Sequence, residues 1–202
     1  MLKQFVEEKE KARFETFIDA ILAIIMTILV LEFKVPEERF DSDASLKSYL
    51  LHLTPSFVSY FISFSTIMIL WIDHHNLFRL LKSVNIPLVL LNFLFILFLS
   101  ATPFTTSLAG RNFESAQAVT FVAVNYILMN LAFSSIWVYA QINNMIPEEA
   151  QKTLSTKREN IVILIGILLQ IASIPFAFVS TYISFMLFIL VLLLHLFRLW
   201  RH

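Results

Sequence analysis

Six apolar stretches, each about as long as a membrane span, constrain the fold of this chain more than any other feature. A transmembrane helix needs about 20 mostly apolar residues. The six stretches lie at about residues 14–33, 49–73, 86–107, 115–140, 160–179 and 181–200. Hydrophobic residues make up 58% of the chain and charged residues 15%, which is too apolar for one soluble core. The sequence therefore predicts an all-α membrane protein, in which residues 1–202 form one domain of six transmembrane helices.

Lysine and arginine are distributed unevenly over the connections between these predicted spans. One side of the membrane would carry Lys3, Lys9, Lys11, Arg13, Arg79, Lys82, Lys152, Lys157, Arg158, Arg198 and Arg201. The other side would carry Lys34, Arg39, Lys47 and Arg111. Positive charges favour the cytoplasmic side, so we expect a multi-pass protein of the cell membrane with both termini in the cytoplasm.

Composition argues against several classes of function. The formal net charge is zero, which gives no indication of nucleic-acid binding, and the absence of cysteine excludes disulfides and thiolate metal sites. The run Asp73-His74-His75 could suggest a metal, but adjacent histidines on a helix diverge by about 100°. The sequence shows no pairing of a nucleophile with a base. We therefore predict neither an enzyme, nor a bound metal, nor a cofactor.

The first span has a mixed face. At 3.6 residues per turn, Ile24, Thr27 and Leu31 project in similar directions, together with Phe17 and Ala20. If several copies of this helix surrounded an axis, they would form rings of aliphatic side chains with a ring of hydroxyls between them. Aliphatic rings exclude water, and hydroxyl oxygens replace part of the hydration shell of a cation. From spacing alone, ordinary helix packing remains the more frequent meaning of such a stripe.

Asp19 lies about one turn inside the first span. A carboxylate in a membrane usually has a partner or a function. Arg13 lies on nearly the opposite side of the helix, so a partner from another span is expected. Trp71 and His75 are spaced i, i+4 near the cytoplasmic end of the second span, and a bond from either would hold two helices in register. Direct contact of Asp19 with an ion remains the alternative.

The second span also carries hydroxyl groups on one face, at Ser56, Ser59, Ser63 and Thr66. Small side chains allow helices to approach closely, and hydroxyls form hydrogen bonds across the contact. We interpret this stripe as a packing surface, with a water-lined path as the less favoured alternative.

Two segments resemble a known family. Arg13-x-x-x-Phe17-Ile18-Asp19, followed by AILAIIMTILVLE, resembles the opening of the transmembrane protein 175 family, and WIDHHNLFR resembles its second block. The family usually has serine where this chain has Ile18, which leaves a hydroxyl role at that position unfilled. The resemblance implies a potassium-permeable, potassium-preferring cation channel. It also implies that single-repeat chains assemble as homotetramers in the bilayer, with the first helices lining the pore.

The resemblance assigns roles to particular residues. Ile24, Ile28 and Leu31 would form the pore-lining rings and the gate, and Thr27 would provide the preference for potassium. The residues of a supporting polar network would be Arg13, Phe17, Asp19, Trp71 and His75. The residues themselves agree in one respect: a filter of backbone carbonyl groups needs a glycine-rich loop, and the two glycines, Gly110 and Gly166, do not form one.

A secondary transporter of a small cation or solute is the alternative function. Transporters commonly contain internal repeats and helices broken near the middle of the membrane. Pro103 is expected to end the third span and Pro175 to break the fifth, which favours a transporter. No internal repeat is visible, which favours a channel.

Overall fold

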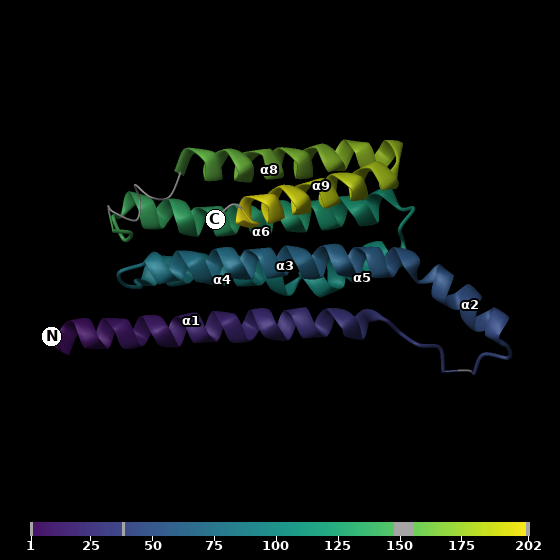
Figure 1. The fold of residues 1–202 in the computed structure, drawn as a ribbon, viewed down its shortest axis with the longest axis horizontal. Coiled ribbons are helices and arrows are strands. Elements are labelled where there is room, and N and C mark those ends of the chain that lie inside the picture. The colour runs from purple at the N-terminus through teal and green to yellow at the C-terminus, as the bar shows by residue number, and fades with distance from the viewer. Residues whose placement is uncertain (1, 38, 148–155, 201–202) are drawn as a thin grey trace.

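The computed structural model describes residues 2–37, 39–147 and 156–200. Within these ranges the chain is helical and contains no β-strand, which confirms the predicted all-α class (Figure 1). The elements are α1 (Leu2–Ile28), the 3₁₀ helix η1 (Leu29–Glu32), α2 (Asp43–His52), α3 (Thr54–Leu80), α4 (Ile86–Ser100), α5 (Thr102–Arg111), α6 (Ala116–Ile142), α8 (Thr156–Val179) and α9 (Thr181–Trp200).

The described helices are those of a multi-pass membrane protein. Five segments are long and apolar enough to cross a bilayer: Lys9–Glu32, Thr54–Leu80, Ile86–Arg111, Ala116–Ile142 and Thr181–Trp200. A shorter apolar segment, Ile161–Ala177, lies in α8. The six apolar stretches of the sequence thus each correspond to a helix or a helix pair.

The helices lie roughly parallel in layers, with α1 at one edge of the bundle (Figure 1). The middle layer contains α3, α4 and α5, and the opposite edge contains the hairpin of α8 and α9 beside α6. Helix α1 contacts α3, α4 and α5, while α2 projects beyond the far end of the bundle. The N-terminus of α1 and the C-terminus of α9 point to the same end of the molecule. Helix α1 is therefore covered on one side only.

Several helix boundaries differ from those expected from the sequence, and proline explains two of them. The second long helix begins at Thr54, with Pro55 in its first turn, and continues to Leu80. Pro103 does not end the third span; it lies in the first turn of α5, and the span is broken at Ala101. A proline ring displaces the carbonyl group four residues earlier, which accounts for this break. The expected break at Pro175 was wrong, because α8 continues through it to Val179.

Buried polar contacts join the helices behind α1. The hydroxyl of Ser63 on α3 lies 2.6 Å from Thr106 Oγ1 on α5 and 2.7 Å from the Tyr126 hydroxyl on α6. His74 Nε2 lies 2.9 Å from Asn92 Oδ1, which joins α3 to α4. Since buried polar groups in a membrane protein need partners, these contacts fix how α3, α4, α5 and α6 pack. The hydroxyl stripe of α3 is thus a packing surface at Ser63.

Candidate functional site

Helix α1 has two distinct faces. Ile18, Leu22, Ile25 and Leu29 recur at intervals of three or four residues and are buried against the core. At 100° per residue, Ile24 and Thr27 project from the opposite side. That side is open in the single chain: the exposed fraction is 56% for Ile24, 38% for Ile28 and 71% for Leu31. The residues predicted to line a pore therefore lie together on the uncovered face of α1.

Thr27 is the hydroxyl-bearing residue of this uncovered face. Its Oγ1 donates a hydrogen bond to the backbone oxygen of Ile24 at 2.8 Å. This bond fixes the position of the hydroxyl against its own helix. Because the hydroxyl proton points inward, the oxygen lone pairs stay available to a cation or to water.

The C-terminal end of α1 is tied to neighbouring helices. The helix tightens into η1, and Phe33 follows in an extended conformation. The ring of Phe33 stacks on Phe57 of α3 with centroids 4.6 Å apart, and Arg111 Nη2 of α5 donates to the Glu32 backbone oxygen at 3.2 Å. These contacts fix the turn that carries Leu31.

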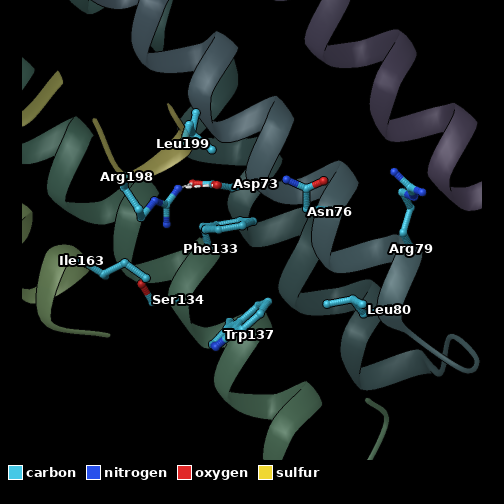
Figure 2. A pocket seen from close by; sticks show the side chains of 10 residues that line it. All are labelled: Asp73, Asn76, Arg79, Leu80, Phe133, Ser134, Trp137, Ile163, Arg198 and Leu199. Carbon is cyan, nitrogen blue, oxygen red and sulfur yellow. Dashed lines mark hydrogen bonds and ion pairs between the residues drawn. The ribbon is translucent and has the colours of Figure 1, made fainter. Parts of the chain in front are cut away.

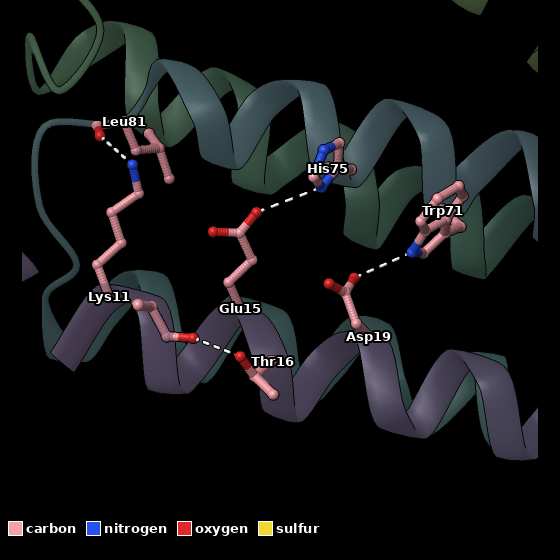
Figure 3. A network of polar contacts seen from close by, with 8 residues as sticks. Lys11, Glu15, Thr16, Asp19, Trp71, His75 and Leu81 are labelled. Carbon is pink, nitrogen blue, oxygen red and sulfur yellow. Dashed lines mark hydrogen bonds and ion pairs between the residues drawn. The ribbon is translucent and has the colours of Figure 1, made fainter. Parts of the chain in front are cut away.

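The N-terminal half of α1 carries a row of polar contacts to α3 (Figure 3). Trp71 Nε1 donates to Asp19 Oδ1 at 3.0 Å. Of the two partners expected for Asp19, Trp71 and His75, it is therefore Trp71 that forms the hydrogen bond. The rings of Trp71 and His75 stack with centroids 5.7 Å apart. Asp19 thus faces the neighbouring helix α3, on a different side of α1 from Thr27.

Sequence reasoning missed Glu15, which lies next to Asp19 in this row. His75 Nδ1 is 3.3 Å from Glu15 Oε1, and Lys11 Nζ donates to the Leu81 backbone oxygen at 2.7 Å (Figure 3). The signal was present, because Lys11, Glu15 and Asp19 follow one another at i, i+4, i+8. The same spacing relates Trp71 and His75, so two polar rows on two helices face each other.

The structure does not bring Arg13 and Phe17 into this polar row. Arg13 is exposed on the outer side of α1. The ring of Phe17 is 44% exposed and lies 6.0 Å from Phe93 of α4 and 6.4 Å from Phe14. Of the five residues predicted to form the network, Asp19, Trp71 and His75 therefore lie together.

A cavity lies at the same end of the bundle, on the side away from α1 (Figure 2). Its volume is about 460 Å³, and helices α3, α6, α8 and α9 line it. Asp73 and Arg198 form a largely buried ion pair in its wall. This pair accounts for two charges that the sequence left without partners, and it attaches the end of α9 to α3.

Similarity to known proteins accords with this architecture. Residues 13–103 match the family described as endosomal/lysosomal potassium channel TMEM175. A crystal structure from Chamaesiphon minutus, of a homologue of the lysosomal potassium-selective channel TMEM175, superposes with a TM-score of 0.81 over 94% of this chain and 98% of that chain, at 24% identity. A TMEM175 potassium channel variant solved with a nanobody fusion gives a TM-score of 0.59 at 19% identity, covering 91% of this chain and 90% of that chain.

Curated relatives carry channel names. A potassium channel of Chamaesiphon minutus is 31% identical over 137 residues, which cover 66% of this chain and 68% of that protein. A potassium channel of Streptomyces collinus is 33% identical, and the match covers 63% of each chain. The human endosomal/lysosomal proton channel TMEM175 is 30% identical over 68% of this chain, which corresponds to 29% of the human protein. These names describe channels and no class of enzyme. This chain therefore belongs to the TMEM175 family.

Proposed function

We propose that this protein is a potassium-permeable, potassium-preferring cation channel of the cell membrane. The chain assembles as a homotetramer, and the uncovered faces of four α1 helices line the pore. Ile24, Ile28 and Leu31 form aliphatic rings that gate it, and Thr27 provides the preference for potassium. Both termini lie in the cytoplasm.

The single observation that carries this proposal is the open face of α1. A helix at the edge of a monomer, with aliphatic residues exposed opposite its buried side, is suited either to contact lipid or to surround an axis with other copies. Thr27 favours the second possibility. Its hydroxyl oxygen lies on this face and can accept a hydrogen bond from water or coordinate a cation. The potassium-channel names of the bacterial relatives support the same function.

The mechanism follows from the alternation of aliphatic and hydroxyl side chains. Closely spaced rings of isoleucine and leucine exclude water and close the path. When the rings move apart, a potassium ion passes the Thr27 ring, whose four oxygens replace part of its hydration shell. Potassium loses water at lower cost than sodium, so weak side-chain ligands favour potassium.

Potassium and sodium flux through purified protein in liposomes tests the proposal. We expect the natural sequence to conduct potassium in preference to sodium, and Thr27→Ala to conduct with the preference reduced. Thr16→Ala is the matched control, since Thr16 is also exposed on α1 and bonds to the backbone oxygen of its own helix at Ala12. Flux with unchanged selectivity in Thr27→Ala, or an equal loss in Thr16→Ala, would contradict the role of Thr27.

Two further measurements separate this function from its alternatives. The vertebrate relatives are named proton channels, so proton flux is measured in the same liposomes with an internal pH indicator. Potassium flux under symmetric pH, without coupled proton movement, is the expected result. Saturable flux of fixed stoichiometry with protons or another solute would instead establish the secondary transporter.

A further inference from the structure

Three metal-ligating side chains converge where α1 meets α3. They are Glu15 and Asp19 of α1 and His75 of α3, and one potential ligand atom from each lies within 4.8 Å of the other two. Figure 3 shows both carboxylates directed from α1 toward α3, with the His75 ring above Glu15. None of the three is fully exposed, so the cluster is a partly enclosed interhelical site rather than a charged outer surface.

The negative charge of this cluster is not balanced by a nearby lysine or arginine among the residues that the structure describes. Two carboxylates lie together near the membrane, and the nearest lysine on the same row, Lys11, donates to the backbone oxygen of Leu81. Among the residues that the structure describes, the basic side chain within 4.0 Å of Glu15 is the imidazole of His75, and not a lysine or an arginine. A further positive charge between these groups would offset their mutual repulsion.

One nitrogen in this cluster also lacks a hydrogen bond. His75 Nδ1 is inaccessible to solvent and, although it lies 3.3 Å from Glu15 Oε1, the two groups do not meet hydrogen-bond geometry. An imidazole nitrogen held near a carboxylate oxygen without a bond between them leaves room for an ion that binds both. Asp19 keeps one oxygen for the same purpose, since Trp71 donates to the other.

We infer that Glu15, Asp19 and His75 form a binding site for a divalent transition-metal ion of the zinc class. One imidazole nitrogen and two carboxylate oxygens are a ligand set that zinc accepts, and a water molecule completes four-fold coordination. Tetrahedral zinc with bonds of about 2.0–2.1 Å would place its ligand atoms about 3.3 Å apart. The present spacings, all within 4.8 Å, therefore have to shorten to about 3.3 Å, through side-chain rotations of Glu15 and His75.

A metal in this position would join the proposed pore helix to α3. Ligands from both helices would be held by one ion, so α1 could not rotate or slide against α3 without breaking a coordination bond. If α1 lines the pore as proposed above, the ion restrains the helix that presents Thr27 and reduces potassium flux. The binding site itself does not depend on that function.

Metal titration of purified protein in detergent tests the site directly. The protein is first stripped of metal with a chelator and then titrated with Zn²⁺, and separately with Co²⁺, whose visible absorption reports nitrogen and oxygen ligation. We expect about one Zn²⁺ per chain. The variant Glu15→Gln keeps the shape of the side chain, and His75→Gln replaces the imidazole with a polar amide. Each is expected to weaken binding roughly 100-fold, by comparison with the effects known for groups that only support a metal ligand.

Matched controls distinguish this site from adventitious binding. Glu10→Gln changes an exposed carboxylate on the same helix, and His52→Ala removes an exposed histidine at the end of α2. Both are expected to bind Zn²⁺ like the natural protein. Size-exclusion profiles and circular dichroism establish that every variant is folded, and a variant that is misfolded is replaced by Asp19→Asn for the same comparison.

The outcomes are decisive in both directions. Loss of the Co²⁺ band and of Zn²⁺ in Glu15→Gln and His75→Gln, with binding kept in the two controls, establishes the site. Binding unchanged in those variants, no binding in the natural protein, or equal competition by Mg²⁺ and Ca²⁺ overturns it. Since no flux is measured, failure of the channel proposal leaves this result intact, and the reverse also holds.

Discussion

The indole nitrogen of Trp71 lies 3.0 Å from Asp19 Oδ1 and joins the C-terminal half of α3 to the first apolar turns of α1. A carboxylate at this depth needs a donor, and an indole N–H is a donor that carries no charge of its own. The contact fixes the register of the two helices. It also keeps Asp19 away from the outer face that carries Thr27.

Replacing the indole tests the strength of this contact. Trp71→Phe keeps an aromatic ring but removes the N–H, so Asp19 loses its donor, and we expect the free energy of unfolding to fall by about 0.5–2 kcal/mol. Thermal unfolding in detergent measures the change. Trp200→Phe is the control, because Trp200 is 86% exposed at the end of α9. An equal decrease in both variants would contradict a specific role for the Trp71–Asp19 bond.

Gly110 provides a test of close helix packing. A Cβ atom at this position would lie 2.9 Å from Ser56 Cα and 3.0 Å from Ser56 Oγ. Because the nearest atom belongs to the backbone, α5 would have to move away from α3, and Gly110→Ala is expected to destabilise the protein by about 1–3 kcal/mol. Gly166→Ala is the comparison, since the atom nearest to its Cβ would belong to a side chain, His195 Cε1 at 2.8 Å, and no backbone atom is among its nearest contacts. A larger loss of thermal stability in Gly166→Ala than in Gly110→Ala would show that the close approach of α5 to α3 at Gly110 is not the more tightly packed of the two sites.

The ion pair between Asp73 and Arg198 predicts a strong coupling across 125 residues of sequence. Arg198 is 7% exposed and Asp73 14%, so removing one partner leaves a charge that is poorly solvated. Asp73→Asn and Arg198→Gln are each expected to cost about 3–5 kcal/mol. The double variant should cost clearly less than the sum of the two, as measured in a double-mutant cycle by thermal unfolding. Additive losses would show that the pair is not coupled.

The uncovered face of α1 predicts the effect of shortening a gate residue. Leu31 is 71% exposed in the single chain, and in the proposed tetramer Leu31→Ala would widen an aliphatic ring and raise potassium flux several-fold. Leu90→Ala is the control, because Leu90 is an equally apolar residue, 63% exposed on α4. Liposome flux is the measurement. Unchanged flux in Leu31→Ala, or an equal rise in Leu90→Ala, would remove Leu31 from the gate.

The sequence was sufficient to predict features that depend on the repeat of residues along a single helix. The length of the apolar stretches predicted the all-α class, and the i, i+4 spacing of Trp71 and His75 predicted a partner for Asp19. These signals are local, because side chains three or four residues apart share a face whatever the rest of the chain does.

Features that depend on contacts between distant helices could not be read in this way. The pairing of Asp73 with Arg198 and of Ser63 with Tyr126 requires knowing which spans are neighbours, and hydropathy does not contain that information. The predictions made for the two prolines were wrong for a related reason. Pro103 interrupts the helix at Ala101 whereas Pro175 is accommodated within α8, and surrounding helices decide which of the two occurs.

The tightening of α1 into η1 has a geometric consequence for the candidate gate. A 3₁₀ turn advances about 120° per residue, against about 100° in an α-helix. Over the three steps from Ile28 to Leu31, the difference accumulates to about 60°. Leu31 is thereby turned away from the line of Ile24 and Thr27 and toward the direction of Ile28. A local change in winding between Leu29 and Glu32 would swing the leucine side chain through that arc while the body of α1 stayed in place.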